Sequence, residues 1–495
     1  MSFRWSRVQV GSVLVAGCAV LSAQDRRVVT EPKIPAACVT LTAQLRAVDD
    51  KIAEADETRL DTQRIQAALD HCKAGMAVEL KATAGKNAFL SGPLDLRAGV
   101  TLLVDKGVTL YGSRDAKDYD LGTGVCGMIA PTPPAVYPAP PSAPARGGCR
   151  ALINISNAKD TAVMGDGVID GRGYVQITFD GKLKGYSWWQ MARKAEPQNL
   201  RYYDPRLIVA NHADGLILYG IALHNSPNFH VSVNGTDGFT AWGVHLLTPT
   251  VKGTDARNTD GIDPGSSTNV TVAHSFIDNG DDNIAVKSGV SYMSVLDNHF
   301  YSGHGMSIGS ETTPGQSFLL VDGLTEDHTT SGIRIKSNVT RGGLVHDLTY
   351  RNVCMRGVAN PIAISPYYTN QTTEGFVDPG YKGEKIPDYK KIVLQNITSE
   401  TPGDVLIAGL DEAHRTEVTL DRVIVKGIQP EQVHLAFADL TTISHGDNSG
   451  AQGTNLNLSG GKSVKVIPGG YQRVESKRRT ADYGGSCGDV FVPMR

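Results

Sequence analysis

Residues 216–223 read Leu-Ile-Leu-Tyr-Gly-Ile-Ala-Leu, and segments of the same kind recur at 239–246, 270–277 and 293–300. Their starts are separated by 23, 31 and 23 residues. A spacing of about 20–50 residues is typical of repeat architectures, in which each unit buries its apolar side chains against its neighbours. The units alternate in polarity and are rich in β-branched residues, which favours strands over helices. The repeats therefore predict an all-β chain wound as a solenoid.

A short helix is predicted ahead of the repeats, over residues 61–72. Asp61 is a suitable N-cap residue, and the apolar side chains at 65, 68, 69 and 72 share one helix face. The open apolar end of a solenoid needs a cap, and this helix is well placed to supply it. Residues 24–495 are predicted to form one domain, with the Pro-rich stretch within 126–149 as a surface loop. A β-sandwich with strands every 8–12 residues is the alternative.

The amino terminus carries the pattern of an export signal. Arg4 and Arg7 precede an apolar stretch at 8–21, and Ser22-Ala23 offers a small-residue cleavage site. The stretch is too short for an ordinary membrane-spanning helix, and no other segment is long and apolar enough. We therefore expect residues 1–23 to be a signal peptide and the protein to be secreted or periplasmic. The alternatives are lipidation at Cys18, because the preceding residues resemble a lipoprotein box, and a buried first strand or helix.

Cysteine usage fits an exported protein. Six cysteines remain beyond residue 23, and an even number is compatible with three disulfides in an oxidising compartment. Proximity in the sequence suggests the pairs Cys38–Cys72, Cys126–Cys149 and Cys354–Cys487, although fifteen pairings are open and some cysteines are alternatively buried thiols. No CxxC pair is present, which argues against a zinc site. The 48 basic and 51 acidic residues give a net charge of −3, which does not indicate a nucleic-acid partner.

Charged residues recur at the period of the coils. The elements are Asn258-Thr-Asp260, Gly280-Asp-Asp282, Gly303-His-Gly305 and Arg334-Ile-Lys336. Asp260, Asp282 and His304 are separated by 22 residues each, so in a solenoid of that period they lie side by side on strands ~4.8 Å apart. Arg334 and Lys336 follow after a longer coil, and their i, i+2 spacing puts both side chains on one strand face. The pattern predicts one patch of three carboxylates, an imidazole and two cations.

This patch has the groups that glycoside hydrolysis requires, a protonated acid and an ionised base or nucleophile. Crowded carboxylates repel one another, so one pKa is expected to rise. Arg334 and Lys336 suit an anion such as a sugar carboxylate. Calcium binding and carbohydrate binding without catalysis are alternatives. Gly305-Met-Ser-Ile-Gly309 matches an esterase nucleophile elbow, but it reads as a solenoid strand and not as the strand-to-helix turn that an elbow needs.

The four motifs, in this order, resemble those of the polygalacturonases of glycoside hydrolase family 28. The flanking segments 225–231, 257–264 and 303–312 also look like bacterial endo-polygalacturonases. The resemblance spans roughly residues 50–430. It implies a right-handed parallel β-helix and inverting hydrolysis of α-1,4-galacturonan, with no cofactor and no metal. An endo-acting enzyme is favoured, with an exo-acting enzyme, another pectic hydrolase, a pectate lyase or a non-catalytic binding solenoid as alternatives.

The resemblance also implies roles for individual residues. Asp281 is the general acid, Asp260 and Asp282 activate water, and His304 supports the acid and the substrate. The residues implied to bind the galacturonate carboxylates are Arg334 and Lys336, with Tyr368 and Lys287 as further candidates. Tyr367 stands beside Tyr368 and competes for the same position in the match. We expect the partner to be polygalacturonate and, as the default for a solenoid with capped ends, the protein to be a monomer.

Overall fold

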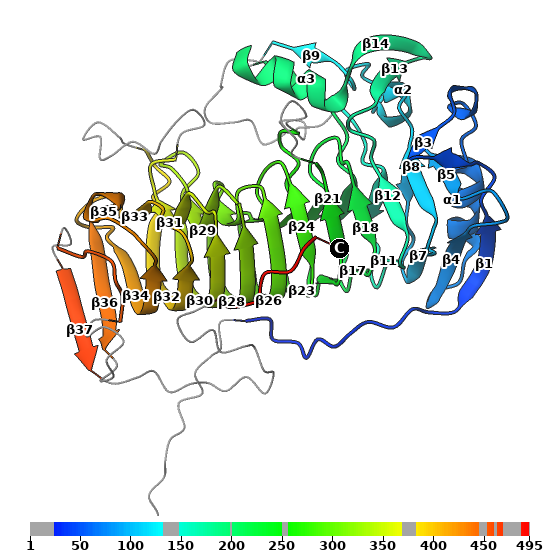
Figure 1. The fold of residues 1–495 in the computed structure, drawn as a ribbon. Coiled ribbons are helices and arrows are strands. Elements are labelled where there is room, and N and C mark those ends of the chain that lie inside the picture. The colour runs from blue at the N-terminus through cyan, green and yellow to red at the C-terminus, as the bar shows by residue number, and fades with distance from the viewer. Residues whose placement is uncertain are drawn as a thin grey trace, which may run out of the picture.

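The computed structural model describes residues 24–131, 148–198, 200–249, 256–368, 383–444, 453–459, 463–468 and 487–494. The predicted signal peptide at 1–23 and residues 132–147 of the predicted Pro-rich loop lie outside the described residues. Figure 1 shows the remainder as a row of stacked coils that runs from the N-terminal end to the C-terminal end.

Each coil contributes strands to two parallel sheets. The smaller sheet has eleven strands in the described chain, and it is the one that carries the site. In chain order they are β6 (Leu94–Asp95), β10 (Ile153–Ser156), β16 (Ile208–Asn211), β19 (Val231–Asn234), β22 (Ile262–Gly265), β25 (Ile284–Val286), β27 (Met306–Gly309), β29 (Ser331–Lys336), β31 (Asn360–Ser365), β33 (Val405–Ala408) and β35 (Val433–Ala436).

The larger sheet wraps the other sides of the coils with twenty described strands. Its first half contains β1 (Ala37–Thr42), β4 (Met76–Lys81), β5 (Ala88–Ser91), β7 (Val100–Val104), β8 (Thr109–Gly112), β11 (Ala162–Met164), β12 (Val168–Asp170), β17 (Ile217–Tyr219), β18 (Ala222–His224), β20 (Thr240–Trp242) and β21 (His245–Leu247). Its second half contains β23 (Thr268–Ala273), β24 (Phe276–Asn279), β26 (Ser291–Ser302), β28 (Gly315–Asp327), β30 (Leu344–Arg356), β32 (Asp388–Ser399), β34 (Thr416–Val425), β36 (Ala438–Ser444) and β37 (Ser463–Pro468).

The repeats identified in the sequence coincide with successive coils. Ile217 pairs with Thr240, Thr240 with Thr271, and Val270 with Met293, which are steps of 23, 31 and 23 residues. All these pairings are parallel. The predicted all-β solenoid is therefore confirmed as a parallel β-helix, and the β-sandwich alternative is wrong.

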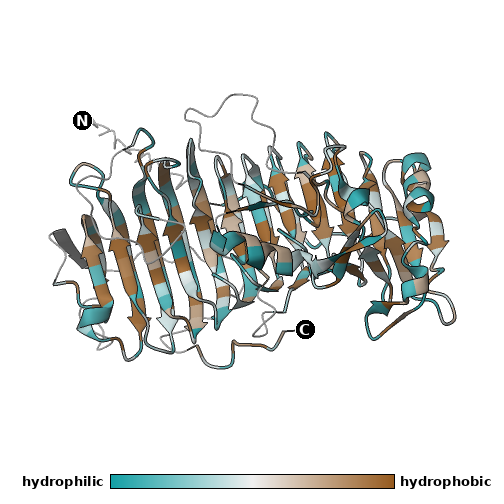
Figure 2. Cartoon of the chain, turned by 90° about the horizontal axis from the view of Figure 1, so that it is seen from above, coloured by the Kyte–Doolittle hydropathy of each residue, from teal (hydrophilic) through white to brown (hydrophobic). Residues whose placement is uncertain are grey.

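An aliphatic ladder holds the smaller sheet in register. Ile208, Val231, Ile262, Ile284 and Met306 pair in sequence across β16, β19, β22, β25 and β27, and all five are buried. They belong to one continuous core cluster that runs along the solenoid, and Figure 2 shows hydrophobic residues recurring on the strands of successive coils. Because hydrophobic burial contributes roughly 25 cal/mol per Å², slipping one coil by a residue would turn its ladder side chain outward at a large cost in free energy.

The corners of the coils explain the abundance of Gly, Asn and Asp. Asp297, Gly323, Asn352 and Asn396 occupy the same corner on β26, β28, β30 and β32, and each has a positive φ. Gly323 has a φ of 76°, and a Cβ there would meet a carboxylate oxygen of Asp297 at 2.4 Å. Residues that tolerate the left-handed region are needed at each such corner.

The predicted capping helix is present as α1 (Thr62–His71) at the N-terminal end of the solenoid (Figure 1). Ile65 and Leu69 are buried in the core, as its apolar face predicts. Asp61 stands at the N-cap position, but its side chain accepts no hydrogen bond from the helix backbone. It accepts from Arg64 instead, from Nη2 at 2.5 Å and from Nε at 3.0 Å. The predicted capping role of Asp61 is therefore wrong, because the nearby guanidinium competes for the carboxylate.

The predicted disulfides are all formed: Cys38–Cys72, Cys126–Cys149 and Cys354–Cys487. They connect the capping helix to β1, bracket the Pro-rich segment and fasten residues 487–494 to β30. Such bonds persist in oxidising compartments, which supports an extracytoplasmic location. No helix among the described residues is both long and apolar enough to span a bilayer.

A small lobe lies along one edge of the solenoid, toward its N-terminal half (Figure 1). It contains α2 (Ala116–Tyr119), α3 (Trp188–Ala195), β9 (Ile129–Ala130), β13 (Gln176–Phe179), β14 (Lys182–Ser187) and β15 (Arg201–Tyr202). Trp189 is buried, and its indole N–H donates to the carbonyl of Ser226 at 2.8 Å. The lobe is thereby fixed to the turn that leads into β19.

Candidate active site

Asp260, Asp282 and His304 lie side by side at the entrance to three consecutive strands. Each stands two residues before the paired positions Ile262, Ile284 and Met306 of β22, β25 and β27. The 22-residue spacing of the sequence is thus converted by strand pairing into neighbouring positions. The predicted convergence of the motifs on one patch is confirmed in space.

Arg334 and Lys336 reach the same patch from β29. Met306 pairs with Ile333, a step of 27 residues, so this coil is longer, as predicted. Arg334 Nη1 donates to Asp282 Oδ1 at 3.1 Å, and Lys336 Nζ donates to Asp282 Oδ2 at 2.7 Å. Both cations therefore share the same face of the strand, in agreement with their i, i+2 spacing.

Asp282 is a buried carboxylate that is held in its charged form. Its side chain is 1% exposed, and Ser307 Oγ adds a third hydrogen bond, to Oδ1, at 2.7 Å. Burial raises the pKa of Asp282, but the charges of Lys336, Arg334 and Lys287 outweigh burial and hold the pKa well below its ordinary value. The charged form of Asp282 is consequently favoured by its surroundings.

Asp281 is paired with His304. His304 Nδ1 lies 3.2 Å from Asp281 Oδ1 and 3.9 Å from Asp282 Oδ1. Burial raises the pKa of Asp281, but the hydrogen bond and the positive charge of His304 outweigh it, and the pKa lies below its ordinary value. The imidazole of His304 thus favours the charged form of Asp281.

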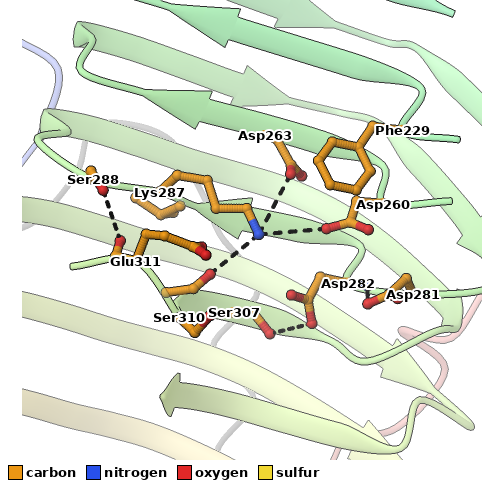
Figure 3. Close-up of polar contacts among 12 residues, drawn as sticks. Phe229, Asp260, Asp263, Asp281, Asp282, Lys287, Ser288, Ser307, Ser310 and Glu311 are labelled. Atoms are coloured by element: carbon orange, nitrogen blue, oxygen red, sulfur yellow. Dashed lines mark hydrogen bonds and ion pairs between the residues drawn. The ribbon is translucent and has the colours of Figure 1, made fainter. Parts of the chain in front are cut away.

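Lys287 connects two further carboxyl groups on the other side of Asp282 (Figure 3). Its Nζ lies 3.6 Å from Asp260 Oδ2 and 3.6 Å from Asp263 Oδ2, and it donates to the carbonyl of Gly309 at 3.3 Å. Asp260 Oδ1 and both oxygens of Asp263 are buried and have no hydrogen-bond partner among the described residues. One ammonium therefore serves two crowded carboxyl groups, which leaves each of them incompletely compensated.

The pKa values of these two carboxyl groups are raised. Burial raises the pKa of Asp260 well above its ordinary value, and the charges of Asp263 and Asp281 add to the effect. Burial also raises the pKa of Asp263, to about 6, against the opposing charge of Lys287. The sequence predicted one raised carboxyl pKa in the patch. Among the predicted carboxyl groups of the site, Asp260 is the one whose pKa is raised, whereas the pKa of Asp281 is lowered.

Tyr368 stands next to the two cations. Lys336 Nζ lies 5.2 Å and Arg334 Cζ 5.7 Å from the centre of its ring. Tyr367 is buried, and its hydroxyl donates to the carbonyl of Leu410 on the far side of the strand. Of the two neighbouring tyrosines, Tyr368 is the one that faces the site.

A divalent cation has a possible set of ligands in this patch. Oxygen and nitrogen atoms of Asp281, Asp282 and His304 lie within 4.8 Å of one another. However, Lys336 and Arg334 already neutralise Asp282 at hydrogen-bond distance. A cation bound there would lie against two fixed positive charges, so this donor set fits an anionic ligand better than a metal.

Two residues of the site were not predicted from the sequence. Asp263 lies in the same segment as Asp260, and an acidic residue at i+3 was a signal for it. Ser307 matched an esterase motif, but it lies on a strand and its hydroxyl donates to Asp282, so it positions a carboxylate. Only the alternation of β27, which points Ser307 away from the core, could have indicated this.

Comparison with known proteins agrees with this geometry. The family model described as "Glycosyl hydrolases family 28" matches residues 72–440. A polygalacturonase from Ralstonia nicotianae is 35% identical over 100% of this chain and 98% of its own length. An endo-polygalacturonase from Pectobacterium carotovorum subsp. carotovorum is 39% identical over 81% of this chain and 90% of its own length.

Solved structures lead to the same family. The polygalacturonase from Erwinia carotovora ssp. carotovora has a TM-score of 0.69 and 37% identity, covering 83% of this chain and 100% of that one. An exopolygalacturonase from Yersinia enterocolitica has a TM-score of 0.59 at 22% identity and shares the fold. The four motifs, their arrangement on consecutive coils and these likenesses together show that the chain belongs to glycosyl hydrolase family 28.

Proposed function

We propose that this protein is a polygalacturonase, which hydrolyses the α-1,4 bonds of polygalacturonate. The observation that carries the proposal is the buried Asp282 carboxyl group held between Lys336 and Arg334, beside the Asp281–His304 pair. A carboxylate-bearing sugar fits the cations, and the neighbouring carboxyl groups supply the acid and the base that glycosidic cleavage requires. The relatives named polygalacturonase over nearly the whole chain support this substrate.

In this proposal Asp281 protonates the leaving oxygen. His304, whose Nδ1 lies 3.2 Å from Asp281 Oδ1, is positioned to pass a proton to Asp281. Asp260 and Asp282 activate the attacking water, and the neighbouring cations favour the charged form of Asp282. Arg334, Lys336 and Tyr368 bind the sugar on one side, and Lys287 holds Asp260. Attack by water without a covalent intermediate inverts the configuration at the anomeric carbon.

We further propose that the enzyme is endo-acting. Support comes from the relative named endo-polygalacturonase, which is 39% identical, whereas the exopolygalacturonase structures from Yersinia enterocolitica and Thermotoga maritima are 22% and 18% identical and share only the fold. The three disulfides support action outside the cytoplasm. We also infer that residues 24–495 act as a single domain and as a monomer.

The proposal is tested with a product time course on polygalacturonate, using protein that starts at residue 24. New reducing ends, viscosity and ultraviolet absorbance are followed together, with and without a chelator. We expect reducing ends without unsaturated product, a rapid fall in viscosity and no effect of the chelator. Proton NMR of the earliest product should show the β-anomer, as inversion of an α-linkage requires. Unsaturated product would identify a lyase, and a retained α-anomer would contradict inversion.

A further inference from the structure

Two buried asparagines flank the loop that carries Asp281. Asn279 ends β24, Asn283 directly precedes β25, and both side chains are completely buried. Nδ2 of Asn283 donates to Oδ1 of Asn279 at 2.8 Å, so the two amides form one hydrogen-bonded unit, the Asn279–Asn283 pair. The mechanism proposed above uses neither side chain. Because a buried amide is unfavourable unless its hydrogen bonds are made, the other partners of the pair indicate what it holds.

The Asn279–Asn283 pair binds the backbone of all three segments that bring reactive groups to the site. Nδ2 of Asn279 donates to the carbonyl of Thr259 at 2.8 Å and to the carbonyl of Asp282 at 2.9 Å. Oδ1 of Asn283 accepts from the N–H of Gly305 at 2.8 Å. Thr259 directly precedes the carboxylate of the Asn-Thr-Asp motif, and Gly305 directly follows the histidine of the Gly-His-Gly motif. The pair therefore connects the three motifs from inside the solenoid.

The Gly-His-Gly segment fits closely on this pair. A Cβ at Gly303 would meet Oδ1 of Asn279 at 2.7 Å and Oδ1 of Asn283 at 2.9 Å, so a side chain there would displace both amides. The N–H of His304 donates to the carbonyl of Asp281 at 2.9 Å. The turn that presents the imidazole thus lies directly on the pair and on the backbone of the proposed acid.

These hydrogen bonds bear on the distances that the reaction requires. A buried backbone N–H or C=O that loses its partner is costly, so each of the three segments is held at a fixed distance from the other two. Inverting cleavage places the acid and the base ~6.5–9.5 Å apart, with a water molecule beside the base. A displacement of about 1 Å in such an arrangement reduces the rate by roughly 100-fold.

We propose that Asn279 and Asn283 are positioning residues of the hydrolysis, which set the separation of the proposed acid, the water-activating carboxylates and the imidazole. This inference rests on the proposed function and deepens it. Both amides are completely buried, so they act through the backbone of the motifs and not by contact with the sugar. The cations proposed to bind the sugar, Arg334 and Lys336, lie on β29, outside the three connected segments. The pair should therefore affect kcat more than KM.

The test measures kcat and KM on polygalacturonate for Asn279→Ala, Asn283→Ala and the double variant, well below the melting temperature of each. We expect kcat to fall by about 10- to 100-fold in each single variant, with KM within about twofold of the wild-type value. The double variant should lose about as much as either single variant, because each change breaks the same unit.

Asn298→Ala is the matched control. Asn298 is also completely buried, its Nδ2 donates to the carbonyls of Val272 at 2.9 Å and Leu296 at 3.1 Å, and its Oδ1 accepts from the N–H of Ser275 at 2.9 Å. These partners belong to β23, β26 and the turn between β23 and β24, and none is part of the four motifs. Asn298→Ala should lower the melting temperature about as much as Asn283→Ala, but kcat should change by less than about twofold.

A second variant keeps the test decisive if Asn283→Ala does not fold. Asn283→Asp has nearly the same shape and keeps the acceptor for the N–H of Gly305. It removes the amide donor to Asn279, because an ionised carboxylate only accepts hydrogen bonds. We expect the same fall in kcat with little change in KM.

The outcomes separate the two proposals. If the wild-type protein releases no reducing ends from polygalacturonate, the proposed function fails and the positioning role falls with it. If the wild-type protein hydrolyses polygalacturonate but the folded variants keep its kcat, only the positioning role fails. A rise in KM at unchanged kcat, or an equal loss of kcat in Asn298→Ala, would likewise overturn it and leave the pair a role in stability alone. Losses that multiply in the double variant would contradict action as one unit.

Discussion

Lys336 Nζ lies 2.7 Å from Oδ2 of Asp282, and both side chains are almost completely buried. An ammonium group in this position keeps the carboxylate charged in surroundings that would otherwise favour its protonated form. Lys336 therefore has two effects in the proposed enzyme. It attracts the sugar carboxylate, and it sets the charge of the group that activates water.

Replacing Lys336 should move the acid side of the pH–activity profile. In Lys336→Gln the pKa of Asp282 rises, because the largest opposing charge is lost while burial remains. A base with a higher pKa becomes protonated at higher pH, so kcat/KM of the variant should fall more steeply toward low pH than that of the wild-type protein. Lys426→Gln removes an ion pair of 2.5 Å with Glu400 outside the site and should leave the limb in place. A fall in kcat/KM that is uniform across pH would show that Lys336 acts on the substrate alone.

Replacing Asp263 should shift the same limb in the opposite direction. Asp263 contributes to the raised pKa of Asp260 and competes with it for Lys287. In Asp263→Asn the pKa of Asp260 therefore falls. If Asp260 acts in its ionised form, the acid limb extends to lower pH.

The control for this measurement is Asp278→Asn on β24. The pKa of Asp278 is likewise raised by burial, to about 6, but the side chain is in the larger sheet. Asp278→Asn should therefore leave the acid limb of the pH–activity profile unchanged. A shift of the basic limb in Asp263→Asn, in place of the acid limb, would show that Asp260 works in its protonated form.

The acid role of Asp281 predicts a large loss on removal of its proton. Asp281→Asn should keep the melting temperature and reduce kcat on polygalacturonate by roughly 100- to 10,000-fold. The loss should be much smaller on a galacturonide with a good aryl leaving group, because such a group departs without protonation. Retention of more than a tenth of the wild-type rate on polygalacturonate would contradict the assignment.

The Cys354–Cys487 bond predicts a local effect on stability. It fastens residues 487–494 to the larger sheet, where Tyr301 donates to the carbonyl of Val492 at 2.7 Å and Arg356 lies over the ring of Phe491. Replacing both cysteines with serine should lower the free energy of unfolding by about 2–5 kcal/mol and expose the C-terminal segment to limited proteolysis. Activity at moderate temperature should persist, because the site is on the smaller sheet. Simultaneous loss of activity and of protease resistance would show that the segment supports the site.

The sequence allowed the fold and the row of motifs to be predicted because hydrogen-bonded register converts a sequence period into spatial adjacency. Asp260, Asp282 and His304 could be placed from their spacing, and Arg334 and Lys336 from strand alternation. The same argument does not reach contacts that depend on side-chain conformation. The ammonium of Lys287 extends back to two carboxyl groups of the preceding coil, and Asp61 turns to Arg64 in place of the helix backbone.

The electrostatics of the site were less accessible to prediction. Sequence spacing indicates that carboxyl groups are crowded, but the direction of each pKa shift depends on which cation each group contacts. Asp282 has two cations at hydrogen-bond distance, and its pKa is lowered. Asp260 shares one ammonium group with Asp263 at 3.6 Å, and its pKa is raised. A difference of less than 1 Å between cation and carboxylate thus separates groups with opposite behaviour.

The aliphatic ladder of the smaller sheet has a consequence for how this site can change in evolution. The distances between its reactive groups along the solenoid axis are set by the strand step of ~4.8 Å, because each group belongs to one strand of the smaller sheet or to its entrance. Loop insertions between these strands, such as the longer coil before β29, leave those distances unaltered. A new cleavage specificity therefore arises by exchanging a residue on a strand of the smaller sheet or by adding a whole coil. The length of polymer that the enzyme contacts then grows in steps of one strand.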